Sequence, residues 1–134
     1  MFRVSREIEF CYGHRLLNYQ GKCCHLHGHN GKVVIIIEAG GLDDRGMVLD
    51  FGDIKRAVKG WIDEHLDHRM ILNRNDPAVP LLEKLGEPMF LLDTNPTAEN
   101  IARLIFDITA AKGYPVVEVR LWETPCCYAS FKKK

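Results

Sequence analysis

The chain has 134 residues, of which 46% are hydrophobic, and its 18 basic side chains balance its 18 acidic ones. That length fits a single domain over residues 1–134 with a sizeable buried core. The balanced charge gives no long-range attraction to nucleic acid or to a lipid surface, so neither is expected as a partner. No stretch is apolar enough for a signal peptide or a membrane span, and four of the five cysteines stand in adjacent pairs that suit reduced thiols. We therefore expect a soluble, cytoplasmic protein.

The first predicted element is a half-buried strand from Phe2 to Tyr12. Its residues alternate between an apolar and a polar face, with Arg6 as the exception on the apolar side. A loop from about Arg15 to Leu26 follows, and the apolar run from Val33 to Ile37 predicts a second strand. We expect the two strands to pair as a hairpin.

The loop and the start of the second strand contain an unusual concentration of metal-binding side chains. Nine residues from Lys22 to Asn30 hold three of the six histidines and two of the five cysteines. If the strand begins at His27, its two-residue period places His27 and His29 on one face, and hairpin pairing brings His14 close to them. Three imidazoles with one open position are typical of a catalytic zinc site. Solvated loop histidines are the alternative interpretation.

Two amphipathic helices are predicted next. Apolar residues at three- and four-residue spacing indicate the first, with Asp50 or Asp53 as its N-cap and an end near Leu66. The second helix is expected to begin with Asn95 as its N-cap and Pro96 in the first helical position.

The segment between the helices, residues 69–96, is predicted to be a long loop with one short helix over residues 79–85. Two more strands are expected, from Val116 to Glu123 and from Cys126 to Phe131. Glu123 ends an apolar row, so its carboxylate lies either at the solvent edge or buried against a partner. The order of elements predicts an α+β domain, with a four-stranded antiparallel sheet and both helices on one face. Other subunits are expected to cover the second face.

Five motifs along the chain resemble those of the 6-pyruvoyl-tetrahydropterin synthase family. They are Phe10 to His14, CxxxHGH from Cys23 to His29, Leu66-Asp67-His68 with Leu72-Asn73, Pro96-Thr97-Ala98-Glu99-Asn100, and Trp122-Glu123-Thr124. The likeness covers nearly the whole chain. The short spacing within CxxxHGH is most similar to the bacterial branch, the 6-carboxy-tetrahydropterin synthases of queuosine biosynthesis.

The resemblance implies a tunnelling fold, in which strands from several subunits join into a barrel. The usual assembly is a homohexamer, a dimer of trimers, with active sites at subunit interfaces. The implied site residues are His14, His27 and His29 as zinc ligands, Cys23, Asp67 and His68 as the catalytic set, and Glu123, Glu99 and Thr97 for pterin binding. A carboxylate can accept two parallel N–H bonds from a pterin, which favours the buried position for Glu123. Cys24, directly beside Cys23, departs from the family pattern and leaves open which thiol reacts.

The implied activity is that of a zinc-dependent carbon–carbon lyase. It would convert 7,8-dihydroneopterin triphosphate to 6-carboxy-tetrahydropterin and release acetaldehyde and triphosphate, with the Cys23 thiolate as base and Asp67 and His68 relaying a second proton. Candidates for contacting the triphosphate, if they are not ordinary surface charges, are Arg15, Lys22 and Arg69. One rival function is the sister synthase, which stops at the pyruvoyl product. The other is a non-catalytic zinc or redox module in which a cysteine closes the fourth metal position.

Overall fold

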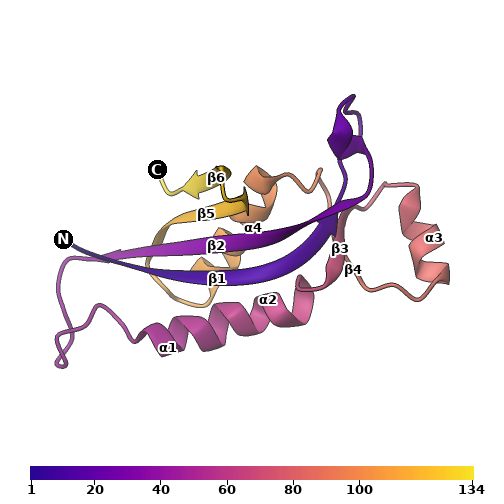
Figure 1. The fold of residues 1–134 in the computed structure, drawn as a ribbon. Coiled ribbons are helices and arrows are strands. Elements are labelled where there is room, and N and C mark those ends of the chain that lie inside the picture. The colour runs from indigo at the N-terminus through magenta and orange to yellow at the C-terminus, as the bar shows by residue number, and fades with distance from the viewer.

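A long β-hairpin is the centre of the protein, which we describe from a computed structural model covering residues 1–134. β1 (Phe2–His14) and β2 (His27–Ala39) pair antiparallel along their whole length, with His14 opposite His27. The hairpin crosses the molecule as a curved ribbon, and the loop between its strands extends beyond the sheet (Figure 1). This pairing confirms the predicted hairpin, although the first strand is longer than expected.

Four shorter strands extend the hairpin into a six-stranded sheet with the order β4-β3-β1-β2-β5-β6. On one side, β5 (Val116–Thr124) pairs antiparallel with β2, and β6 (Cys127–Lys132) pairs antiparallel with β5. On the other side, β3 (Arg69–Asn73) and β4 (Met89–Leu92) pair parallel, and β3 pairs parallel with β1. The prediction of four antiparallel strands was therefore wrong.

The two strands that the sequence did not predict lie in the segment expected to be a loop. Both are short, and neither shows an alternating pattern, because Ile71 and Leu72 are both fully buried on opposite sides of β3. A parallel pair needs a crossover connection, and α3 (Ala78–Lys84) lies in it. That helix is close to the predicted short helix and lies at one end of the molecule (Figure 1).

Two longer helices cover one face of the sheet, as predicted. The first is continuous and consists of α1 (Phe51–Ile54), a π-helical segment (Lys55–Lys59) and α2 (Gly60–His65). Asp50 caps it, because its carboxylate accepts the Gly52 N–H at 2.8 Å. The second is α4 (Ala98–Ala111), and side chains from both helices join β1, β2 and β5 in one apolar cluster of 19 buried residues.

The start of α4 differs from the prediction. Thr97 is the N-cap, and its hydroxyl accepts the Asn100 N–H at 3.1 Å. Asn95 instead contacts the loop after β1, where it accepts the Leu17 N–H at 3.0 Å and donates to the Leu17 carbonyl at 2.8 Å. The predicted cap at Asn95, with Pro96 inside the helix, was wrong because this long-range contact occupies the Asn95 side chain.

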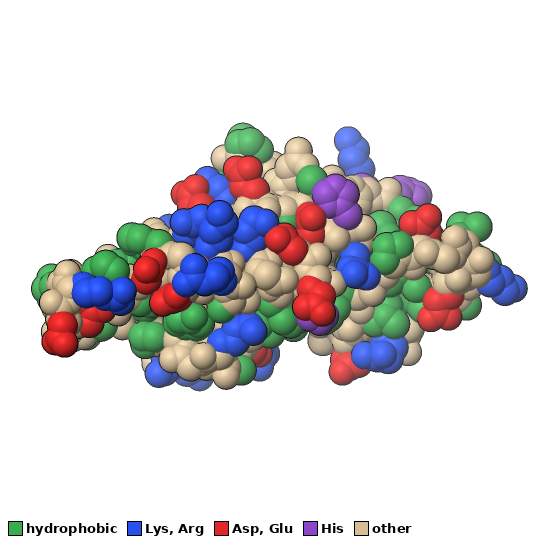
Figure 2. All heavy atoms as spheres, turned by 90° about the horizontal axis from the view of Figure 1, so that it is seen from below, with side chains coloured by type: hydrophobic (Ala, Val, Ile, Leu, Met, Phe, Trp, Pro, Cys, Tyr) green, Lys and Arg blue, Asp and Glu red, His purple; other side chains and the backbone are tan.

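The face of the sheet away from the helices carries charged side chains in ion pairs. Arg3 pairs with Glu38 at 2.8 Å, and Arg120 pairs with Glu118 at 2.5 Å. Basic and acidic side chains also lie side by side over the surface shown in Figure 2, in keeping with the balanced composition. None of the helices is both long and apolar enough to cross a membrane.

Candidate active site

Three imidazoles meet at one end of the central hairpin. His14 ends β1 and lies opposite His27, the first residue of β2, while His29 lies two residues further along on the same face. One ring nitrogen from each histidine lies within 4.8 Å of those from the other two. The hairpin therefore brings the three predicted ligands together, and they are positioned to hold a metal ion.

The hydrogen bonds of these rings suit metal binding. Nδ1 of His14 donates to the Pro96 carbonyl at 2.6 Å, and Nδ1 of His27 donates to the His25 carbonyl at 2.7 Å. Each bond fixes the tautomer that leaves the Nε2 lone pair free. Burial lowers the pKa of His14, which favours the neutral ring.

The Nε2 atoms of His14, His27 and His29 are all buried and have no hydrogen-bond partner. Leaving a buried polar atom without a partner costs free energy, and a cation shared by the three nitrogens would remove that cost. The three residues therefore fit a metal ion bound through nitrogen.

Glu123 lies beside this cluster. Its carboxylate oxygens are 3.8 Å from Nε2 of His14 and 3.8 Å from Nε2 of His29, and its side chain is 23% exposed. The pairing of β5 with β6 shifts register between Trp122 and Thr124, directly around this residue. The side chain is therefore half-buried, between the two positions that the sequence left open. Glu123 is not close to all three ring nitrogens, so the cluster contains no carboxylate.

A small hollow joins Glu123 to Glu99, which lies in the first turn of α4. Its volume is about 190 Å³, and Ala98, Cys127, Tyr128 and Ala129 complete its lining. Two carboxylates in a partly apolar hollow can accept N–H bonds from a flat heterocycle. Thr97 does not line this hollow, because its hydroxyl caps α4.

Asp67 and His68 lie between α2 and β3 in the chain, and neither lines the hollow between Glu99 and Glu123. Asp67 accepts the Cys11 N–H at 2.9 Å and the His68 Nδ1–H at 2.8 Å, and the His68 N–H donates to the Cys11 carbonyl at 2.7 Å. Burial opposes ionisation of Asp67, but these two hydrogen bonds outweigh it and keep the pKa of the carboxyl below its usual range.

His68 is held in an unusual backbone conformation. Its φ of 58° lies in the left-handed region that few residues other than glycine adopt. The imidazole is 78% exposed, and it lines a hollow of about 630 Å³ together with His27 and His29. The Asp67–His68 pair is therefore oriented but open to solvent.

The chain matches a known family over nearly its full length. The sequence model described as 6-pyruvoyl tetrahydropterin synthase matches residues 3–134. The chain belongs to this family.

Curated relatives within the family include two proteins named 6-carboxy-5,6,7,8-tetrahydropterin synthase. The one from Rickettsia bellii is 39% identical over 96% of this chain and 98% of its own length. The one from Haemophilus influenzae is 36% identical over 99% of this chain and 100% of its own length.

Solved structures show the same fold. A crystal structure of a Wolinella succinogenes protein has a TM-score of 0.84 at 29% identity and covers 99% of this chain and 98% of that chain. The Caenorhabditis elegans 6-pyruvoyl tetrahydropterin synthase has a TM-score of 0.73 at 23% identity and covers 99% of this chain and 96% of that chain.

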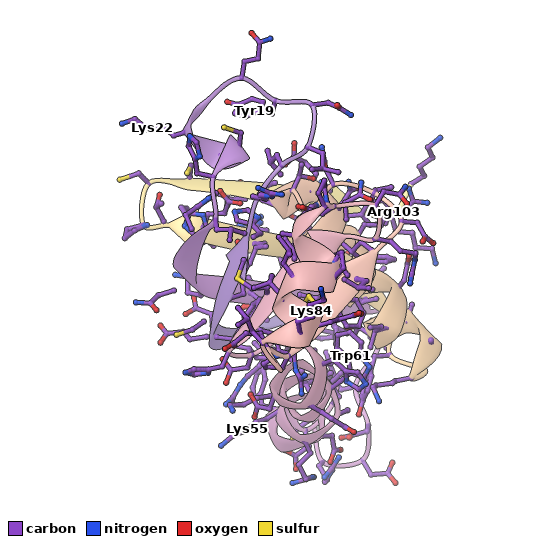
Figure 3. The ribbon with its side chains drawn as sticks, turned by 90° about the vertical axis from the view of Figure 1, so that its right-hand side faces the viewer. Tyr19, Lys22, Lys55, Trp61, Lys84 and Arg103 are labelled. Atoms are coloured by element: carbon purple, nitrogen blue, oxygen red, sulfur yellow. The ribbon has the colours of Figure 1, made fainter.

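The cysteines that the family motif points to lie in the loop after β1. Cys23 and Cys24 are half-buried in a short 3-10 turn (Lys22–Cys24) rather than in an extended segment. The Leu16 N–H donates to the Cys23 carbonyl at 2.8 Å and ties the turn to the end of β1. Figure 3 shows this loop, with Tyr19 and Lys22, beyond the edge of the sheet.

Within one chain, no hydrogen bond joins Cys23 to Asp67 or His68. The cysteine whose backbone holds Asp67 is Cys11, which also lines the larger hollow. Sequence reasoning did not place Cys11 at the site, because only the parallel pairing of β3 with β1 brings Asp67 to it.

The three basic residues suggested for phosphate contact differ in their surroundings. Arg15 forms a two-pronged ion pair with Asp76, whose side chain is fully buried, and is therefore already partnered. Arg69 donates to the Glu64 carbonyl at 2.8 Å and lines the larger hollow. Lys22 is exposed on the loop.

Proposed function

We propose that the protein is a cytoplasmic, zinc-dependent 6-carboxy-tetrahydropterin synthase of the queuosine pathway. It converts 7,8-dihydroneopterin triphosphate and one water molecule to 6-carboxy-tetrahydropterin and releases acetaldehyde and triphosphate. The observation that carries this proposal is the set of three unpartnered Nε2 atoms, two of which lie 3.8 Å from the Glu123 carboxylate. Relatives with this name at 36–39% identity support it, and the five free cysteines suit a reducing compartment.

Zinc is the metal that best suits three imidazoles with an open position, and when bound it stabilises negative charge on a substrate oxygen. Glu123 accepts N–H bonds from the pterin ring, and Glu99 lines the same hollow. Cys23, as thiolate, removes a proton from the substrate side chain. Asp67 orients His68, which passes on the second proton before triphosphate leaves and the carbon–carbon bond breaks.

This assignment requires more than one subunit at each site. No hydrogen bond joins Cys23 to Asp67 or His68 within one chain, and the His68 ring is 78% exposed. We propose that a neighbouring copy brings its own loop to this pair, in a homohexamer built as a dimer of trimers. Light scattering on the purified protein tests the assembly, and an active monomer would contradict it.

The activity itself is tested by incubating the zinc-loaded protein with 7,8-dihydroneopterin triphosphate and measuring the product mass and acetaldehyde. We expect the carboxy product with equimolar acetaldehyde. A pyruvoyl product mass with triphosphate release would assign the sister reaction, and no triphosphate release would refute the enzyme. The variant Glu123→Gln tests the role of the carboxylate in this assay. It removes one acceptor at nearly unchanged size and should weaken pterin binding.

The structure gives less support to a non-catalytic zinc module. Such a module needs a fourth protein ligand, yet the metal-binding cluster contains three histidines and no cysteine. The oriented Asp67–His68 pair would also have no function in a non-catalytic zinc module.

A further inference from the structure

Tyr12 is a buried residue of the histidine cluster to which neither the family motifs nor the proposed reaction gives a role. It lies two residues before His14 on the same face of β1, opposite His29, and is 3% exposed. Its ring centroid is 5.2 Å from that of His14 and 5.6 Å from that of His29. The phenol ring therefore forms part of the wall around the metal-binding nitrogens.

The hydroxyl of Tyr12 is fully buried and makes no hydrogen bond of normal geometry, although the Glu123 carboxylate lies near it. A phenol hydroxyl carries its proton at neutral pH, since its ordinary pKa is about 10. A protonated hydroxyl is a hydrogen-bond donor, and leaving it buried without an acceptor costs free energy. An acceptor that enters the site would remove this cost.

The position of the ring is restricted by its surroundings. A β-carbon at Gly31, on the neighbouring strand, would come within 2.9 Å of Tyr12 Cε1. The Tyr12 ring therefore occupies space that a side chain at position 31 would fill. The ring also stacks on Phe10, with centroids 5.1 Å apart. These contacts hold the hydroxyl near Glu123 rather than at the surface.

We propose that Tyr12 donates a hydrogen bond to an oxygen atom of the bound substrate, beside the histidine cluster. The inference rests on the proposed function and adds a substrate-contacting residue to it. Oxygen is the expected acceptor because the substrate side chain carries hydroxyl groups, and their oxygens gain negative charge during the reaction. A hydrogen bond to such an oxygen strengthens as the charge develops.

Tyr12→Phe tests this proposal, because it removes the hydroxyl and keeps the ring. We expect the metal-free variant to unfold at the same or a higher temperature than the wild type, since it no longer buries an unpaired hydroxyl. With one zinc ion per chain still bound, kcat/KM should fall by about 10- to 100-fold, the usual loss for a hydrogen bond to a charged group.

Tyr114→Phe is the matched control. The Tyr114 hydroxyl donates to the Asp53 carbonyl at 3.3 Å, so its removal should lower the unfolding temperature and leave kcat/KM unchanged. A Tyr12→Phe variant with kcat/KM within twofold of the wild type would overturn the proposal.

A second measurement separates this inference from the proposed function. In a Glu123→Gln background, Tyr12→Phe should still cause a further loss of kcat/KM, because the two residues contact different substrate atoms. No further loss in that background would mean that Tyr12 acts through Glu123, which would refute direct contact with the substrate. A wild-type protein without activity would refute the proposed function instead.

Discussion

The imidazole of His14 donates from Nδ1 to the carbonyl oxygen of Pro96 at 2.6 Å, although the two residues are 82 positions apart. The adjacent Asn95 binds both backbone groups of Leu17, in the loop that carries Cys23. One segment before α4 therefore holds both a metal-binding histidine and the loop. Changes in this segment should affect the site without removing a metal ligand.

Asn95→Ala removes two hydrogen bonds to the loop and should cost about 1–2 kcal/mol of unfolding free energy. We expect faster protease cleavage within residues 15–26 and a lower kcat, with zinc still bound, because Cys23 loses its fixed position. Limited proteolysis and steady-state kinetics measure the two effects. Asn75→Ala is the control, since the Asn75 side chain is exposed and makes no hydrogen bond. Equal cleavage rates and equal kcat values for the two variants would contradict the role of Asn95.

Asp76→Asn should destabilise the protein by about 3 kcal/mol at pH 7, because it leaves Arg15 partly buried without its charged partner. Asp93→Asn is the control. It breaks the exposed pair with Arg74, whose side chains are 58% and 87% exposed, and should cost less than about 1 kcal/mol. Urea unfolding measures both.

The same pair predicts a pH dependence. The Arg15 guanidinium holds the pKa of Asp76 below its usual range, so the stabilisation is fully present above the unfolded value of about 4. It is lost as the pH falls through the lowered pKa. The difference in unfolding free energy between wild type and Asp76→Asn should therefore shrink below about pH 4. A constant difference would show that the charge of Asp76 does not matter.

Cys23→Ala should lower kcat by at least about 100-fold and leave zinc bound, because it removes the proposed base but no metal ligand. Cys24→Ala, one residue further along the same 3-10 turn, should have a small effect. Kinetics and zinc content of the two variants decide between the thiols. The reverse result would mean that Cys24 is the base.

Asp67→Asn should also lower kcat by about 100-fold at unchanged zinc content. The asparagine amide is uncharged and has one accepting oxygen, so it cannot accept from both the Cys11 N–H and the His68 Nδ1–H. The imidazole therefore loses its fixed orientation. His65→Ala is the control, because His65 stacks on Trp61 with ring centroids 4.4 Å apart, outside the site. Full activity in Asp67→Asn would exclude the proposed relay.

The metal-binding cluster could be predicted from the sequence because it depends on local rules. The two-residue period of a strand places His27 and His29 on one face, and a hairpin brings His14 to them. The helix covering the sheet was predictable for the same reason, since its apolar residues recur at helical spacing and Asp50 is a common N-cap.

Other parts of the site depend on contacts between distant segments. The parallel pairing of β3 with β1 brings Asp67 to Cys11, and neither short strand has an alternating pattern. Asn95 has the sequence of a helix cap but binds Leu17 instead, because the folded chain brings the loop within reach. The position of Glu123 depends on an irregularity in β5 that no local pattern shows.

X-ray absorption at the zinc edge of the purified protein tests the central claim most directly. The three unpartnered Nε2 atoms predict a first shell of nitrogen and oxygen at about 2.0–2.1 Å, with three imidazoles and an exchangeable water. A sulfur ligand at about 2.3 Å would show that a cysteine closes the site. That result would contradict the open metal centre on which the proposed lyase depends.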